Sequence, residues 1–225
     1  MEKEKKLLII DGHSLLYRAF HALPPLSNSK GQLTNAVYGF LLILFKAIKD
    51  VEANYVVACF DTRKPTFRHE QFEEYKAHRA PMPEGISSQI PIMKEVLVAL
   101  NVPMFEKEGF EADDLVATIA TKNQEKVKVF ILSGDLDNLQ LVNNNIKLYT
   151  MGKGIKESVI YAKKILLQCI KPMYNFQFIA MNVGGVINGI HLIMELNMIL
   201  MFHFLNNLMN CKKWFLDHHH TLQKM

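Results

Sequence analysis

Short apolar runs alternate with amphipathic stretches through the first 164 residues of the chain. Runs of consecutive aliphatic residues are typical of buried strands, and apolar positions spaced by three or four residues are typical of helices. The predicted strands are residues 5–11, 54–61, 102–105, 128–132 and 146–150, and the predicted helices are residues 13–21, 35–49, 86–100 and 111–124. Because strands alternate with helices, we expect an α/β fold with a central, mostly parallel sheet flanked by helices.

The pattern changes after Lys164. Residues 165–225 contain only two acids, Glu195 and Asp217, and are rich in Met, Asn and Ile. No apolar run there approaches the roughly 18 residues that a membrane-spanning helix needs, so we expect no membrane partner. AT-rich DNA tends to encode such a composition when it is read out of frame. We therefore predict two parts: a folded domain at residues 1–164 and an atypical hydrophobic tail at residues 165–225, which is frameshifted or divergent.

Charge and cysteine usage narrow the picture further. With 26 Lys and Arg against 22 Asp and Glu the net charge is +4, which permits a nucleic-acid partner but hardly argues for one. Cys59, Cys169 and Cys211 form no C-x-x-C pair, so neither a disulfide framework nor a thiolate metal site is expected. The apolar run at residues 7–10 is too short for a signal peptide, and we expect a cytoplasmic protein.

Acidic residues recur where the predicted strands end. Asp11, Asp61 and Asp135 each follow an apolar run, and the carboxyl ends of parallel strands meet at one edge of a sheet. The carboxylates expected at this edge are Asp11, Asp61, Glu111, Asp113, Asp114, Asp135 and Asp137. Taken singly, each is more simply a turn or helix-capping residue. Together they would repel one another unless cations neutralised them, and this favours a metal site.

A site made only of carboxylates has a defined metal preference. Hard oxygen ligands without His or Cys favour Mg²⁺ or Mn²⁺ over Zn²⁺, and more than four carboxylates suggest two ions. Ions paired about 4 Å apart are the usual device for phosphodiester cleavage, so the expected reaction is phosphoryl transfer to water. His13 is expected only to form a local hydrogen bond, and His218, His219 and His220 are expected to be a solvated part of the tail.

Four motifs carry a resemblance to a known family. They read IIDGHSLLYRAFHALPP at residues 9–25, CFDTRKPTFRHEQFEEYKAHR at 59–79, GFEADDLVATIA at 109–120 and ILSGDLDNLQLV at 131–142. In sequence and in order they resemble the 5′ nuclease domain of bacterial DNA polymerase I. The resemblance covers residues 6–163 and implies a PIN-like α/β fold, which flap endonucleases and phage 5′ nucleases share.

The resemblance also implies an activity and a ligand set. The activity is that of a magnesium-dependent 5′-3′ exonuclease and flap endonuclease acting on DNA with 5′ ends or flaps. Carried over by motif, the residues of the first metal cluster are Asp11, Asp61, Glu111 and Asp113, with Asp114 beside them. Asp135 and Asp137 would serve the second ion. No small-molecule cofactor is implied, and we expect a monomer.

Residues 66–79 would form part of a helical arch through which the 5′ strand passes. The resemblance places Lys76 and Arg79 near the scissile phosphate as catalytic residues. The DNA-binding residues that it implies are Arg18, Arg68, Phe72, Tyr75, Lys76 and Arg79. The cations would neutralise phosphates and the aromatic rings would stack on unpaired bases. For Phe72, packing into the core is an equally weighted alternative.

The chain also departs from the family pattern. Family members continue into a motif of the type G-D-x-S-D-N-I-P-G-V-x-G-I-G, which supplies two more carboxylates and a helix-hairpin-helix that grips duplex DNA. The nearest text here, VGGVINGI at residues 183–190, has neither aspartate. We therefore expect activity to be impaired at the second metal site. The alternatives are a catalytically inactive, vestigial DNA-binding product and a PIN-type ribonuclease. Gly12 stands alone after the first strand, which argues against a nucleotide-binding dehydrogenase.

Overall fold

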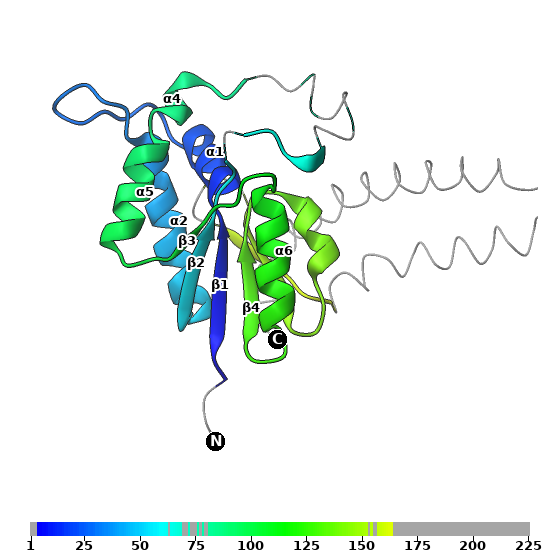
Figure 1. Ribbon diagram of the computed structural model, residues 1–225. Helices are drawn as coiled ribbons and strands as arrows, with labels where there is room; N and C mark the ends of the chain where they lie inside the picture. The colour runs from blue at the N-terminus through cyan, green and yellow to red at the C-terminus, as the bar shows by residue number, and fades with distance from the viewer. Residues whose placement is uncertain are drawn as a thin grey trace, which may run out of the picture. The chain divides into compact units, whose positions relative to one another are not determined.

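A computed structural model of the chain describes residues 4–62, 64–68, 72, 76, 78, 81–152, 154 and 157–163 (Figure 1). The chain divides into two units, Met1–Ala162 and Lys163–Met225, and the first is described below. The tail predicted at residues 165–225 lies outside the described residues, as do Tyr75 and Arg79. Among the described helices, none combines the length and the apolar character needed to cross a bilayer.

Six strands form one sheet in the order β3-β2-β1-β4-β5-β6. The strands are β1 (Lys6–Asp11), β2 (Tyr55–Cys59), β3 (Met104–Phe105), β4 (Lys128–Leu132), β5 (Ile146–Met151) and β6 (Ser158–Tyr161). All neighbours pair in parallel except β5 and β6, which are antiparallel. The predicted mostly parallel α/β sheet is confirmed, with one short antiparallel strand that the sequence did not reveal.

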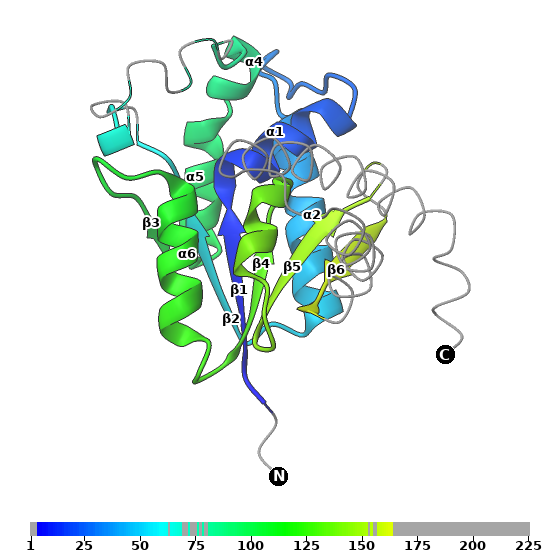
Figure 2. The same ribbon diagram turned by 90° about the vertical axis from the view of Figure 1, so that its right-hand side faces the viewer.

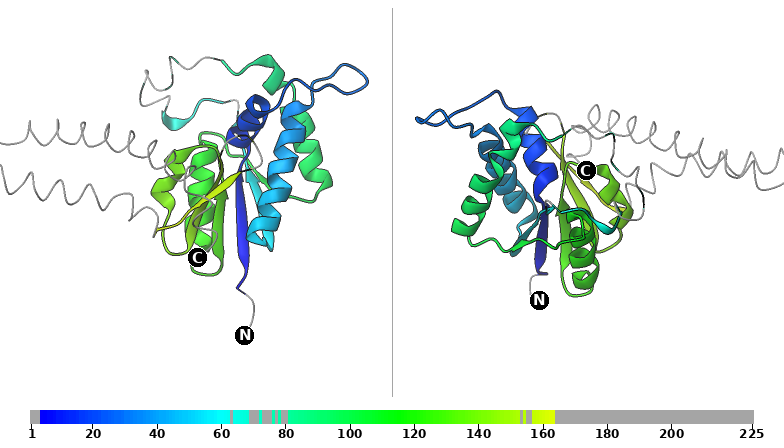
Figure 3. Two further views of the ribbon diagram at one scale, coloured as in Figure 1. Left: turned by 180° about the vertical axis from the view of Figure 1, so that it is seen from behind. Right: turned by 45° about the horizontal axis from the view of Figure 1, so that its top comes forward.

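Helices cover both faces of this sheet. They are α1 (Gly12–Ala22), α2 (Asn35–Val51), α4 (Glu84–Ser87), α5 (Ile90–Ala99) and α6 (Ala112–Asn123), with a 3₁₀ helix, η1 (Leu136–Leu141). Helix α1 packs against α2, and α6 packs against β1, β2 and β4. Figures 2 and 3 show α2 and α5 on the side of the sheet opposite α6.

The alternation along β1 explains why both faces are covered. Leu8 and Ile10 belong to the large core that α1, α2 and α5 close. Leu7 and Ile9 are also buried, and successive strand residues point to opposite faces, so they lie on the α6 side. A strand buried on both faces must be apolar at nearly every position, which is why β1 reads as four consecutive aliphatic residues.

The predicted helix at residues 86–100 is wrong in one respect, because the structure divides it into α4 and α5. Gln89 lies at the break with its side chain buried. Its Oε1 accepts hydrogen bonds from the backbone of Ala36 and Val37 at 2.9 and 3.2 Å, and so satisfies free N–H groups at the start of α2. Pro91 is then the second residue of α5, in the first turn, where its missing N–H costs nothing.

The strand order sets the place of the site. From the central strand β1 the chain passes to β2 on one side, and later returns through α6 to β4 on the other side. In open parallel sheets, ligands bind outside the carboxyl ends of the strands at such a reversal. Strand β1 ends at Asp11, and β4 ends just before Ser133. A ligand site is therefore expected beside these two residues, at the carboxyl ends of the two strands.

Candidate metal and nucleic-acid site

Asp11 ends β1 and caps α1, and only 4% of its surface is exposed. Its Oδ1 accepts a hydrogen bond from the Ser14 backbone at 3.1 Å, and its Oδ2 accepts one from the Ser133 hydroxyl at 2.8 Å. Burial and the negative charge of Asp113 raise the pKa of Asp11 to about 7, with a smaller effect of Asp61, against the two hydrogen bonds. The carboxylate is therefore held in place yet poorly compensated in charge.

The loop after β4 is fastened to the same corner. The Gly134 backbone donates to Ser14 Oγ at 3.0 Å, and the Asp135 backbone donates to Ser133 Oγ at 3.0 Å. Asp135 in turn caps η1 by accepting from the Asp137 backbone at 2.9 Å. Two serine hydroxyls thus connect the ends of β1 and β4, while the Asp135 and Asp137 side chains stay exposed at the rim.

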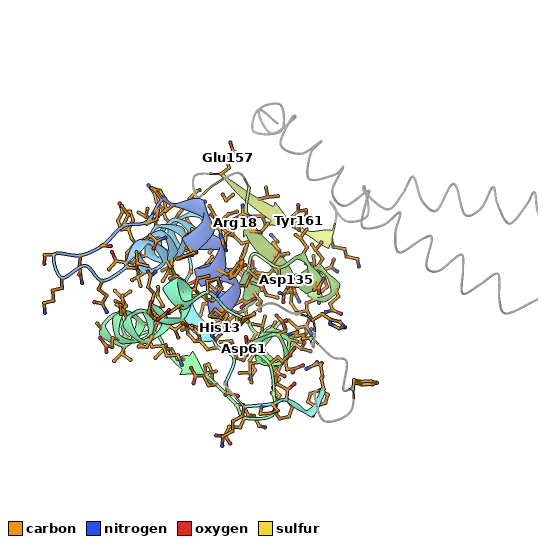
Figure 4. The ribbon with its side chains drawn as sticks, turned by 90° about the horizontal axis from the view of Figure 1, so that it is seen from above. His13, Arg18, Asp61, Asp135, Glu157 and Tyr161 are labelled. Carbon is orange, nitrogen blue, oxygen red and sulfur yellow. The ribbon has the colours of Figure 1, made fainter. Side chains whose placement is uncertain are left out.

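Asp61 lies two residues beyond the end of β2, not at the end of a strand as predicted. Its backbone N–H donates to His13 Nδ1 at 3.1 Å, and Figure 4 shows the two side chains together at this edge. Its Oδ1 accepts from the Ala112 backbone at 2.6 Å, at the first residue of α6. Asp61 therefore joins the start of α1 to the start of α6.

The first turn of α6 carries the acidic triplet. Glu111 is the N-cap and forms a capping box with Asp114, whose Oδ2 accepts from the Glu111 backbone at 3.0 Å. Asp113 is the second residue of α6. Partial burial and the charges of Asp135 and Asp61 raise the pKa of Asp113, while Asn138 and Lys76 lower it. Asp113 and Asp11 thus lie within electrostatic reach of one another.

Two cations from the predicted arch segment contact this turn. Arg68 donates to both carboxylate oxygens of Asp114 at 2.7 Å, and this bidentate contact is the main reason why the pKa of Asp114 is lowered. Lys76 Nζ donates to Glu111 Oε1 at 2.9 Å. Phe72 is 64% exposed, so the alternative of core packing is wrong for this ring.

The donor chemistry of this edge fits a hard divalent cation. Within the part of the chain that the structure describes, no three His, Cys, Asp or Glu side chains lie close enough together to form a metal site. The oxygen donors nevertheless share one edge, where burial and neighbouring carboxylates raise the pKa values of Asp11 and Asp113. The buried Asn138 lies close enough to Asp113 to lower the pKa of that carboxyl. A cation would relieve the repulsion, and all-oxygen ligands suit Mg²⁺ or Mn²⁺.

Comparison with known families identifies the family of the domain that contains this acidic site. Residues 6–169 match the family described as the 5′-3′ exonuclease, N-terminal resolvase-like domain. The chain belongs to this family. The four motifs of the exonuclease domain include the carboxyl ends of β1, β2 and β4 and the start of α6.

Relatives of this exonuclease domain include a DNA polymerase I and a 5′-3′ exonuclease. The chain is 46% identical over 165 residues to DNA polymerase I of Bacillus subtilis, covering 72% of the chain and 18% of the polymerase. It is 42% identical over 170 residues to the 5′-3′ exonuclease of Aquifex aeolicus, covering 72% of the chain and 59% of that protein. The chain thus spans about a fifth of the length of the polymerases that it matches.

Solved structures confirm the fold. The T5 5′-exonuclease with bound divalent zinc ions superposes with a TM-score of 0.57 at 21% identity, covering 73% of this chain and 60% of that one. The bacteriophage T5 flap endonuclease, in a complex with DNA and metal ions, gives a TM-score of 0.54 at 22% identity with the same coverage. The PIN-like α/β fold implied by the sequence is the fold observed.

Several polar residues of the exonuclease domain's site were not predicted. Ser14 follows Asp11 by three residues, the spacing at which an N-cap carboxylate accepts from the backbone, and this signal was available in the sequence. Ser133 and Asn138 gave no such signal, because their partners are far away along the chain. Arg18, a predicted DNA contact, donates to the backbone carbonyls of Met151 and Gly152 and so fastens α1 to the end of β5.

Proposed function

We propose that this chain is a structure-specific 5′-3′ exonuclease and flap endonuclease, which hydrolyses DNA phosphodiester bonds with Mg²⁺ or Mn²⁺. The observation that carries the proposal is the gathering of Asp11, Asp61 and Asp113 at the strand-order reversal of a 5′-3′ exonuclease family domain. There Asp113 raises the pKa of Asp11, and Asp61 raises the pKa of both. Carboxylates held close enough to raise a neighbour's pKa are costly to maintain, so they point to a function that uses the charge.

The metal ligands in this proposal are the predicted ones. Asp11, Asp61, Glu111 and Asp113 would hold the first ion, and Asp135 and Asp137 would hold the second. Asp114 stays a predicted neighbour of the first ion, although both its oxygens accept from Arg68. When bound, such ions lower the pKa of an attacking water and stabilise the charge on a cleaved phosphodiester.

The chain's own cations would bind and orient the DNA. Lys76 lies beside Glu111 and would exchange this carboxylate for the scissile phosphate as the DNA enters, since a lysine ammonium pairs with either anion. Phe72 is exposed enough to stack on an unpaired base. Arg68, Arg18, Tyr75 and Arg79 remain predicted DNA contacts. The proposal includes action in the cytoplasm, as a monomer.

A flap assay tests the proposal directly. The purified chain is incubated with a labelled 5′-flap DNA in Mg²⁺, in Mn²⁺ and in EDTA, next to Asp113→Asn and the control Glu125→Gln. Glu125 is an exposed acid just beyond the opposite end of α6, so removing its charge should leave cleavage unchanged. We expect metal-dependent release of 5′ fragments by the wild type and by the control, and none by Asp113→Asn.

Two other outcomes would select an alternative function. Cleavage of an RNA flap in preference to the DNA flap would indicate a PIN-type ribonuclease. A folded protein that binds the flap without cleaving it in either metal would indicate an inactive DNA-binding product. One observation favours that second alternative: among the described residues, Arg68 and Lys76 already neutralise two of the acids, and no three acids gather as a metal site.

A further inference from the structure

His13 lies in the first turn of α1, immediately below the loop that carries Asp61. Its Nδ1 is 3.1 Å from the Asp61 backbone nitrogen and 3.4 Å from Asp61 Oδ2. Its ring meets the Phe60 ring edge to face, with centroids 5.5 Å apart and an angle of 80° between the planes. Only 17% of the side chain is exposed, so the ring is held by its neighbours on most sides.

The proton on this ring can be placed by elimination. A backbone N–H only donates, so the Nδ1 facing it must carry the lone pair, and the ring proton must be on Nε2. The 3.4 Å approach to Asp61 Oδ2 is therefore not an ion pair in this form of the ring.

The loop at residues 60–61 is clamped around this contact. Gly12 packs so close to Phe60 that a Cβ at position 12 would overlap the ring. On another side, Lys94 Nζ lies 5.3 Å from the centre of the same ring. With Phe60 fixed, the His13 acceptor holds the backbone of Asp61, and the Ala112 N–H holds its carboxylate at 2.6 Å. Asp61 therefore has little freedom to turn away from the edge.

We propose that His13 is a positioning residue for Asp61, whose backbone it holds so that the carboxylate stays between Asp11 and the start of α6. The inference rests on the proposed function, in which Asp61 is a metal ligand. Asp61 is more exposed than its neighbour Asp11, and it follows the end of its strand by two residues. Strand pairing therefore does not fix its direction, which depends on the contacts with His13 and with the Ala112 N–H.

Metal binding measures this role apart from turnover. Mn²⁺ binding to the full chain is followed by the relaxation of water protons, in the wild type, His13→Leu and His13→Asn. The leucine fills the space but cannot accept a hydrogen bond, and we expect its dissociation constant for Mn²⁺ to rise by about tenfold, as for other residues that orient ligands. Asparagine offers Oδ1 in the place of Nδ1, so we expect its affinity to stay close to the wild-type value.

A double-mutant comparison separates positioning from a general loss of structure. Once the Asp61 carboxylate has been removed by Asp61→Ala, a residue that acts only through it has nothing left to position. His13→Leu should then cause no further loss of Mn²⁺ affinity. The proposal is overturned if His13→Leu weakens binding equally in both backgrounds, or if His13→Asn is as weak as His13→Leu.

The position of the ring proton can be tested in the wild-type protein. This test does not depend on whether His13→Leu folds. The ¹⁵N shifts of the His13 ring should show a proton on Nε2 and a lone pair on Nδ1, and a proton on Nδ1 would overturn the proposal. A wild type that binds no Mn²⁺ would overturn the proposed function and this role with it. A wild type that binds Mn²⁺ and cleaves flaps, beside an unaffected His13→Leu, would overturn the His13 role alone.

Discussion

Asp11 and Asp114 lie on the same edge of the sheet in opposite electrostatic surroundings. Asp11 is compensated by a hydroxyl and a backbone N–H, while burial and neighbouring carboxylates raise its pKa to about 7. Asp114 is compensated by the guanidinium of Arg68, which lowers its pKa. We call the surroundings of Asp11 the first corner and those of Asp114 the second corner. No cation of the chain contacts Asp11 among the hydrogen bonds of the described residues, whereas Arg68 contacts Asp114. Residues of one type thus divide into a group suited to an external cation and a group that the fold has already neutralised.

Removing the charge at the first corner should have the largest effect. Asp11→Asn keeps an oxygen for Ser133 but leaves the site one charge short, so we expect flap cleavage in Mg²⁺ to fall by roughly 10³-fold, about 4 kcal/mol. Because the repulsion with Asp113 is also removed, the melting temperature in EDTA should rise. The rates are compared with those of Glu125→Gln. Unaltered cleavage by Asp11→Asn would show that the Asp11 carboxylate is not needed for a catalytic cation.

The pH dependence of stability should distinguish the corners by sign. The pKa of Asp11 is raised from 3.8 to about 7, so its favourable contribution is complete below about pH 4 and is lost as the pH rises through 7. The pKa of Asp114 is lowered, so its contribution is present above 3.8 and is lost as the pH falls further. Between pH 4 and 7 the wild type should lose up to about 4 kcal/mol more unfolding free energy than Asp11→Asn.

Urea unfolding in EDTA measures this difference, and added Mg²⁺ should reduce it, because a bound cation favours the ionised Asp11. Parallel pH profiles for the wild type and Asp11→Asn would contradict the account of the first corner.

Neutralising the second corner should destabilise the fold. Asp114→Asn loses the charge-assisted contact with Arg68 and weakens the capping box at the start of α6, which should cost about 2 kcal/mol. The measurement is the urea midpoint at pH 7. An increase in stability, as expected for Asp11→Asn, would mean that the two corners do not differ.

The smallest effect on stability is expected at Lys76. Its ammonium is partly exposed, so Lys76→Ala should change the unfolding free energy by less than about 1 kcal/mol. It should nevertheless slow cleavage, and any loss of flap binding should diminish at low salt, because the contact with phosphate is electrostatic. A binding defect that is the same at all salt concentrations would point to misfolding instead.

Local patterns revealed the sheet and the acids but not their partners. The run of consecutive aliphatic residues identified β1 and placed Asp11 at its end. A strand of this type can be identified in the sequence because its signal lies in residues next to one another. The contact of His13 with Asp61 spans 48 positions, and that of Arg68 with Asp114 spans 46. Such pairs depend on which elements the fold places together. The break at Gln89 was missed for the same reason, since its partners are at the start of α2.

The antiparallel strand β6 escaped prediction for a different reason. It has only four residues, and its pairing with β5 rather than its own sequence makes it a strand. The exposure of Phe72 and the partners of Arg18 likewise depend on tertiary structure. For Phe72 the sequence was compatible both with stacking on a base and with packing into the core.

The hydrogen bond between Ser133 and Asp11 joins residues 122 positions apart, and this separation has a consequence for biosynthesis. A nascent chain that has emerged only as far as α6 can pair β1 with β2, but the other edge of β1 remains open until β4 has been translated. During that interval Asp11 lacks its hydroxyl donor, and an exposed central strand invites pairing with other chains. The ribosome thus releases the candidate site late, when β4 inserts beside β1 and closes the gap.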